Sequence, residues 1–188
     1  MESWMMLGTS GFDGFISKRD KGAEFAEYLI AKLGERFNIN VASQKDLANV
    51  DHFDHEAAAR QVISTTAFTI VVLSEEGLDA SFETGSDDGS YQLREIKVAA
   101  ETRRTRGQNP PYRIFIIDVV DNGTTEMREA RGVELAERAG LELRNPDYEQ
   151  VSTTGSTDGS WYDDTRKICD TIKAFLSDNA IPLAPQQT

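Results

Sequence analysis

Short apolar segments alternate with amphipathic helical patterns along most of the chain. Four segments have the composition of strands: residues 12–17 (FDGFIS), 37–42 (FNINVA), 68–73 (FTIVVL) and 112–120 (YRIFIIDVV). The third is apolar or β-branched throughout, which is typical of a strand covered on both faces. A short edge strand is expected at residues 141–143.

Between these strands, apolar residues recur at the spacing of amphipathic helices. Gly34 and Gly140 are expected to end the first and fourth helix, because glycine readily adopts the left-handed conformation found beyond helix ends. Residues 43–54 and 151–160 are polar and are predicted to be loops. The helices themselves are expected at residues 20–33, 55–65, 91–104, 124–139 and 161–176.

The strict alternation of strands and helices predicts an α/β fold. Right-handed crossovers then give three layers, a mainly parallel sheet with helices on both faces. In such sheets ligands bind at the carboxyl ends of the strands. Candidate chemistry is therefore expected after Ser17, Ala42, Leu73 and Val120.

The length and composition suit one domain. The chain has 188 residues, 39% of them hydrophobic, enough to bury a core but too few for two ordinary α/β domains. We expect a lead-in at residues 1–11, one domain over residues 12–179 and a flexible tail at residues 180–188.

Charge and cysteine content narrow the possible functions. Lys and Arg number 20 and Asp and Glu 32, so the net charge is −12. Long-range repulsion from phosphate disfavours nucleic acid and anionic membrane surfaces as partners. The single cysteine, Cys169, lies at an apolar helical position, where a core role is favoured. One cysteine permits no internal disulfide, and the N-terminus has no basic, apolar leader, so a cytoplasmic protein is expected.

Two local patterns give only weak evidence for a binding site. Gly8, Gly11 and Gly14 form GxxGxxG rather than the dinucleotide-binding GxGxxG, which favours a flexible lead-in. His52 and His55 lie close to aspartates and could ligate a metal, but further ligands are not evident nearby. A polar loop is the favoured interpretation of that segment, and no metal site is predicted.

Two further positions are candidates for chemistry. Lys18 and Arg19 follow the first strand at the start of the first helix, where free N–H groups and positive charge could hold a phosphate. An ordinary solvated helix start explains them equally well. Glu95 lies one turn into the helix after the third strand, where a carboxylate could stabilise a developing cation. An exposed helical glutamate is the alternative.

Taken in order, these segments resemble the Toll/interleukin-1 receptor (TIR) family. FDGFIS resembles its first strand, VVLS (residues 71–74) its third and RIFIIDV (residues 113–119) its fourth. YQLREI (residues 91–96) resembles its helix start Trp-Cys-x-x-Glu-Leu. Gly14 departs from the family by replacing a β-branched residue, and Gln92 departs from it by replacing the cysteine. The resemblance implies the flavodoxin-like, five-stranded TIR fold.

The resemblance also implies an activity. TIR domains divide into signalling scaffolds and enzymes that cleave NAD+, in which the glutamate matched by Glu95 acts on the ribose beside nicotinamide. It implies NAD+ as the substrate, with neither cofactor nor metal. The expected substrate-binding residues are Phe15 or Tyr91 as an aromatic wall, Lys18 and Arg19 for the pyrophosphate, and Ser17 and Ser74 at the strand ends.

Three functional hypotheses follow from the resemblance. The first is an NAD+ glycohydrolase or cyclase of prokaryotic antiphage defence, as in Thoeris, whose ADP-ribose product, linear, cyclic or conjugated, is sensed by a downstream effector. The second is a non-catalytic TIR interaction module, either an adaptor or an effector that mimics host domains. The third is an enzyme similar to nucleoside 2-deoxyribosyltransferases. The resemblance further implies a homo-oligomer in which the loop at residues 43–55, with Phe53, completes a neighbour's site.

Overall fold

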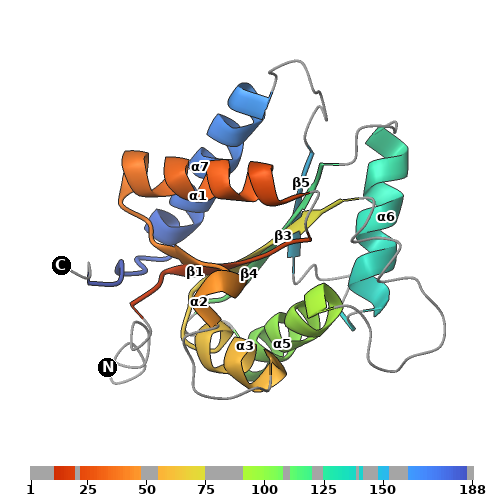
Figure 1. The fold of residues 1–188 in the computed structure, drawn as a ribbon, viewed down its shortest axis with the longest axis horizontal. Helices are drawn as coiled ribbons and strands as arrows, with labels where there is room; N and C mark the ends of the chain where they lie inside the picture. Colours follow the sequence, from red (N-terminus) through yellow and green to blue (C-terminus); the bar gives the residue numbers. More distant parts are fainter. Residues whose placement is uncertain are drawn as a thin grey trace.

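A computed structural model shows a five-stranded, fully parallel sheet (Figure 1). The order across the sheet is β2 (Val41–Ala42), β1 (Gly14–Ser17), β3 (Phe68–Leu73), β4 (Arg113–Asp118) and β5 (Tyr148–Ser152). The predicted α/β class is therefore confirmed. The residues described are 11–19, 22–47, 55–74, 91–107, 111–119, 125–138, 140–141, 148–152 and 161–185.

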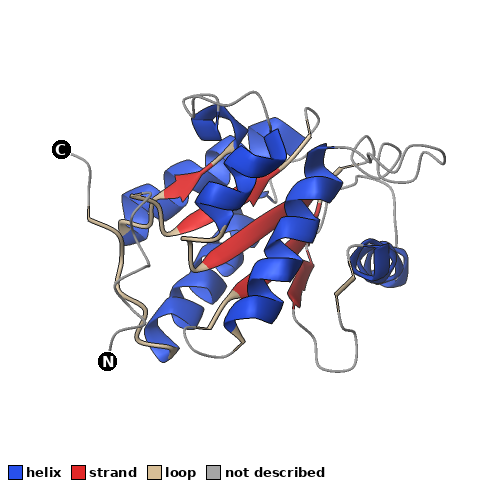
Figure 2. Ribbon diagram, turned by 90° about the horizontal axis from the view of Figure 1, so that it is seen from below, coloured by secondary structure: helices blue, strands red, loops and turns tan. Residues whose placement is uncertain are grey.

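Helices cover both faces of this sheet (Figure 2). Helices α1 (Ala23–Phe37) and α7 (Trp161–Asp178) pack on one face. The other face carries α3 (His55–Ile63), α5 (Tyr91–Arg106) and α6 (Thr125–Arg138), and a short helix α2 (Gln44–Leu47) adjoins them. No helix among the described residues is long and apolar enough to span a bilayer.

Alternating strand residues fill two separate cores. Phe15 packs on the side of α3 and α5, whereas Ile16 packs on the side of α1 and α7, because successive strand side chains point to opposite faces. Ile116 and Ile117 divide in the same way. Cys169 is a residue of α7 whose side chain is buried in the core, so its predicted core role is confirmed. Burial raises the pKa of its thiol to about 11.

A close approach between β1 and β3 explains the glycine at position 14. Gly14 pairs with Phe68 across the two strands. A Cβ atom on Gly14 would lie 2.2 Å from the Phe68 ring. The ring therefore occupies the space of the β-branched side chain expected there, and the departure leaves the fold intact.

Helix α1 is longer than its sequence suggests. Gly34 lies inside the helix, which continues to Phe37, so the expectation that Gly34 ends it is wrong. Asn38 adopts the left-handed conformation (φ 61°), and its N–H donates to the Gly34 carbonyl at 3.0 Å. The Ile39 N–H donates to the Leu33 carbonyl, completing a Schellman-type end with asparagine in place of glycine. The predicted strand at residues 37–42 is consequently reduced to β2.

The last strand and the second loop also differ from expectation. The fifth strand is β5, and Leu141, the one described residue of the strand expected at residues 141–143, lies outside any strand. Residues 151 and 152, predicted to begin a loop, belong to β5, and the predicted loop at residues 43–54 contains α2. These are the least periodic parts of the sequence, so the pattern gave little signal.

Part of the C-terminal tail packs against the domain rather than hanging free. Ile181 is buried in the core beside α1 and α7. The Ala184 N–H donates to Asp13 Oδ1 at 2.5 Å, and Asp13 Oδ2 accepts from the Asn40 N–H at 2.7 Å. Asp13 thus links the C-terminal segment to the residue just before β2, and the loose tail we expected is wrong for this part. Burial raises the pKa of Asp13 despite these bonds.

Candidate functional site

A buried glutamate lies at the carboxyl end of the sheet. Glu95 is on the second turn of α5, and its side chain is 0% exposed. Ser17, the last residue of β1 and also fully buried, donates its hydroxyl to Glu95 Oε2 at 2.5 Å. The structure therefore brings together two residues that the resemblance had assigned to one site.

Two further side chains bind the other carboxylate oxygen. Gln44, the first residue of α2, donates Nε2–H to Glu95 Oε1 at 3.0 Å. His55, the first residue of α3, places Nε2 2.8 Å from the same oxygen. Four elements, β1, α2, α3 and α5, thus converge on one carboxylate. We call Ser17, Gln44, His55 and Glu95 the Glu95 cluster.

The cluster compensates for the burial of a charge. Removing a carboxylate from water is costly unless hydrogen bonds or an opposite charge replace the lost hydration. Ser17 and Gln44 supply neutral donors, and His55 supplies an imidazole that can also carry a positive charge. Such an anion can meet a positively charged or hydroxyl-bearing ligand group without further desolvation of its own.

An aromatic side chain borders the cluster at the surface. The ring of Tyr91 lies 4.5 Å from that of His55, tilted by 53°, and Tyr91 is 52% exposed. The Arg94 guanidinium lies 5.8 Å from the Tyr91 ring centroid. Tyr91 therefore offers an accessible aromatic surface next to His55 of the cluster.

Gln92 fixes the start of α5 over the strand ends. Its amide donates to the Val72 carbonyl at 2.8 Å and to the Ser17 carbonyl at 3.3 Å. Its Oε1 is buried and has no partner among the described residues. The residue that departs from the family's cysteine thus anchors the helix turn that carries Glu95, and it presents an unused acceptor at the same end of the sheet.

The other predicted site residues differ in how far they are buried. Lys18 and Arg19 directly follow Ser17; Lys18 is largely buried, and Arg19 Nε is buried without a partner among the described residues. Ser74 is buried just beyond β3. Phe15 lies wholly within the core, so its ring has no face available to a ligand. Of the two candidate aromatic walls, only Tyr91 is accessible.

Sequence reasoning missed two members of the cluster. Gln44 lies two residues after Ala42, a strand end at which ligands were expected, but no motif marked it. The helix start at His55 was predicted, but the favoured polar-loop interpretation of the two histidines gave His55 no role, whereas it contacts Glu95. No group of three His, Cys, Asp or Glu within the described ranges could hold a metal. His52 lies outside those ranges.

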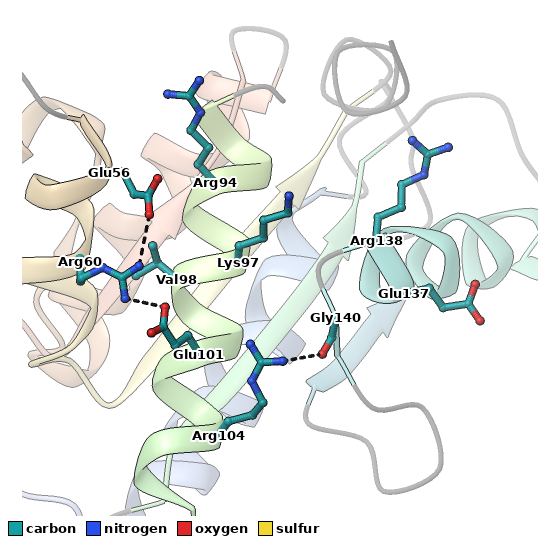
Figure 3. A pocket seen from close by; sticks show the side chains of 10 residues that line it. All are labelled: Glu56, Arg60, Arg94, Lys97, Val98, Glu101, Arg104, Glu137, Arg138 and Gly140. Atoms are coloured by element: carbon teal, nitrogen blue, oxygen red, sulfur yellow. Dashed lines mark hydrogen bonds and ion pairs between the residues drawn. The ribbon is translucent and has the colours of Figure 1, made fainter. Parts of the chain in front are cut away.

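A second polar region lies along the exposed face of α5. A cleft of about 410 Å³ runs between α3 and α6 with α5 between them (Figure 3). Arg60 bridges Glu56 and Glu101 across it, and Arg104 donates to the Gly140 carbonyl. Glu95 does not line this cleft. Its lining residues are Glu56, Arg60, Arg94, Lys97, Val98, Glu101, Arg104, Glu137, Arg138 and Gly140.

Comparison with known proteins gives a structural match alone. No protein-family model and no curated protein matches the chain. Among solved structures, the TIR domains of the activated Roq1 resistosome, which directly recognises the pathogen effector XopQ, superpose with a TM-score of 0.51. The sequences are 14% identical, and the match covers 86% of this chain and 99% of that one. At this identity the likeness shows the fold, which is TIR-like.

Proposed function

We propose that the protein cleaves the bond between nicotinamide and ribose in NAD+, with Glu95 beside the reacting ribose. The observation that carries this proposal is the Glu95 cluster. A buried carboxylate stands at the ligand-binding end of a TIR-like sheet, at the position that the sequence resemblance assigns to the reacting glutamate.

The chemistry needs little beyond a placed negative charge. Nicotinamide leaves with the electrons of the C–N bond, so the ribose becomes an oxocarbenium-like cation. A carboxylate already desolvated by the protein stabilises that charge more strongly than one in water. Addition of water then gives ADP-ribose and a proton. Another nucleophile in place of water gives a cyclic or conjugated product.

The donors on Glu95 suggest how substrate is accommodated. Ser17 belongs to a central strand and holds Oε2, whereas the Oε1 donors, Gln44 and His55, come from helix starts. Ribose hydroxyls are also O–H donors and can replace one or both of these contacts. The carboxylate would then keep its orientation through Ser17 while it changes partners at Oε1.

The remaining substrate contacts are assigned by position. Tyr91 provides an exposed ring on which a base can stack, and Lys18 and Arg19 provide positive charge for the pyrophosphate. We further propose association of identical chains through TIR-like contacts and a role in antiphage defence with a downstream effector that senses the product. Phe53, assigned to the shared site in that association, lies outside the described residues.

One observation favours a second function, that of a non-catalytic interaction module. All three donors to Glu95 come from the chain itself, and together they tie α5 to β1, α2 and α3. A carboxylate satisfied in this way can serve purely to hold the fold together. Catalysis requires the negative charge of Glu95, whereas a structural role requires only its hydrogen bonds. The substitution Glu95→Gln therefore distinguishes the two functions.

The deciding experiment is incubation of purified protein with NAD+, followed by chromatography of nicotinamide and ADP-ribose products. Wild type should release nicotinamide, and Glu95→Gln, which removes the charge but keeps the shape, should be slower by about a hundredfold or more. Glu101→Gln on the exposed face of the same helix is the matched control and should match wild type. Undiminished turnover in folded Glu95→Gln contradicts the proposal. No NAD+ consumption by wild type favours the interaction module, and base exchange between deoxynucleosides favours the transferase hypothesis.

A further inference from the structure

The contact between His55 and Glu95 joins the two groups of the cluster that can carry opposite charges. Their atoms Nε2 and Oε1 are 2.8 Å apart, and the His55 side chain is 23% exposed while that of Glu95 is fully buried. We infer that His55 is a positioning residue that balances the charge of Glu95 in the empty site. It then loses its proton when a pyridinium cation binds beside that carboxylate. This inference rests on the proposed function.

The buried carboxylate of Glu95 gains from a partner that can carry a positive charge. The Glu95 side chain is fully buried, and its other two partners, Ser17 and Gln44, are neutral. A buried carboxylate with only neutral donors keeps most of its desolvation cost, whereas an imidazolium in contact offsets it. A hydrogen bond between ionised groups is also about twice as strong as one between neutral groups.

Among the described residues, the other charged groups on the elements around His55 bind different partners or do not contact its ring. The neighbouring Glu56 is bound by Arg60 at 3.2 Å. On α2, Lys45 is paired with Glu27, and Asp46 accepts from Ser43. On α5, the Tyr91 ring contacts the His55 ring, and the Arg94 guanidinium lies over Tyr91. The cations nearest to Ser17 in the sequence are Lys18 and Arg19, which follow it directly. Direct hydrogen bonding to His55 therefore comes from Glu95.

A ligand with a pyridinium ring changes this balance. Two positive charges would then share one buried carboxylate, and their mutual repulsion is strong at short range in a poorly solvated site. His55 can relieve it by releasing its proton to solvent from its partly exposed ring. The neutral ring still donates Nε2–H to Glu95, so the carboxylate stays oriented. One proton is released for each cation bound, and no other bond is made or broken.

The test measures binding rather than turnover. The probe is carbocyclic NAD+, which keeps the pyridinium charge but lacks the cleavable glycosidic bond; ADP-ribose, which lacks the pyridinium ring, is the control ligand. Calorimetry in buffers of different ionisation enthalpy should show a proton released with the cationic probe near pH 6 and none with ADP-ribose. Affinity for the probe should be about tenfold higher near pH 7.5 than near pH 5.5, the range in which histidine titrates.

Two variants assign the proton. His55→Gln retains an N–H donor for Glu95 but cannot titrate, so proton release and the pH slope should vanish. The matched control is His52→Gln, which replaces the only other histidine and should behave as wild type.

The possible results distinguish failure of the proposed His55 role from failure of the proposed NAD+ cleavage. Probe binding that is independent of pH overturns the role of His55 and leaves NAD+ binding standing. Proton release that persists in His55→Gln also overturns it. If neither carbocyclic NAD+ nor ADP-ribose binds, the proposed function fails and the ligand-linked proton loss fails with it.

Discussion

Two glutamates on α5, six positions apart, occupy opposite environments. Glu95 is fully buried and bonded to side chains from three other elements. Glu101 is 51% exposed and pairs with Arg60 across the open cleft of Figure 3. The residue type and the helix are the same, so position relative to the sheet accounts for the difference.

The comparison shows how one helix can serve two purposes. The face that packs on the sheet includes Gln92 and Glu95 among apolar residues, and each is held by partners from other elements. The opposite face carries charges that pair in solvent, where an ion pair contributes only about 0–1 kcal/mol. We expect the buried polar residues to dominate both stability and function.

The largest expected effect comes from shortening the buried glutamate. Glu95→Ala leaves the buried Ser17 hydroxyl and the partly buried Gln44 and His55 donors without an acceptor and should lower the free energy of unfolding by about 3–5 kcal/mol. Glu95→Gln should cost far less, because its oxygen can accept from Gln44 and His55 while its amide donates to the Ser17 hydroxyl. Denaturant unfolding of both variants measures the difference.

Glu101→Ala is the control for the exposed face. It should lower the free energy of unfolding by less than about 1 kcal/mol. Equal destabilisation by Glu95→Ala and Glu101→Ala would show that the two environments do not differ as the structure indicates. A large loss in Glu95→Gln would instead show that the charge itself holds the fold.

The central strands were predictable because burial on both faces leaves a continuous apolar run. Residues 68–73 were located to the residue as β3, and β4 lies within the predicted run at residues 112–120. The edge strands β2 and β5 have a neighbour on one side only; β2 is only two residues long, and β5 mixes polar with apolar residues. Their sequences carry a weaker pattern, so the predicted bounds of β2 were wrong and β5 was missed.

The candidate site was predictable only where a family motif reached it. Glu95 was a candidate from its place on the helix, the resemblance assigned it to one site with Ser17 and Tyr91, and the structure brings Glu95 to Ser17 and Tyr91 to His55. Gln44 and His55 belong to no motif, and they meet Glu95 only because the crossover from β2 to β3 passes beside α5. Phe15 was predicted as a possible aromatic wall but is buried. Its place in the first-strand motif did not reveal that burial.

An intermediate effect is expected from the cations next to Ser17. Replacing both Lys18 and Arg19 by alanine should raise KM for NAD+ about tenfold with little change in kcat, because pyrophosphate contacts are made equally in ground and transition states. Steady-state kinetics of nicotinamide release provide the measurement. Arg138→Ala in the cleft, where that side chain pairs with Glu134, should leave KM unchanged. A loss confined to kcat would place the two cations at the chemical step instead.

The smallest effect belongs to the ion pair in the cleft. Arg60 Nη1 lies 2.5 Å from Glu101 Oε2, and the bonds with Glu101 and Glu56 raise the pKa of Arg60 above its already high value. The stabilisation linked to that shift is lost only at strongly alkaline pH, so it should be constant around neutrality. A double-mutant cycle of Arg60→Ala and Glu101→Ala should give a coupling of about 0.2–1 kcal/mol that falls as salt is added. A larger coupling that resists salt would mean that the cleft shelters its charges as the Glu95 cluster does, and the contrast between the two faces of α5 would disappear.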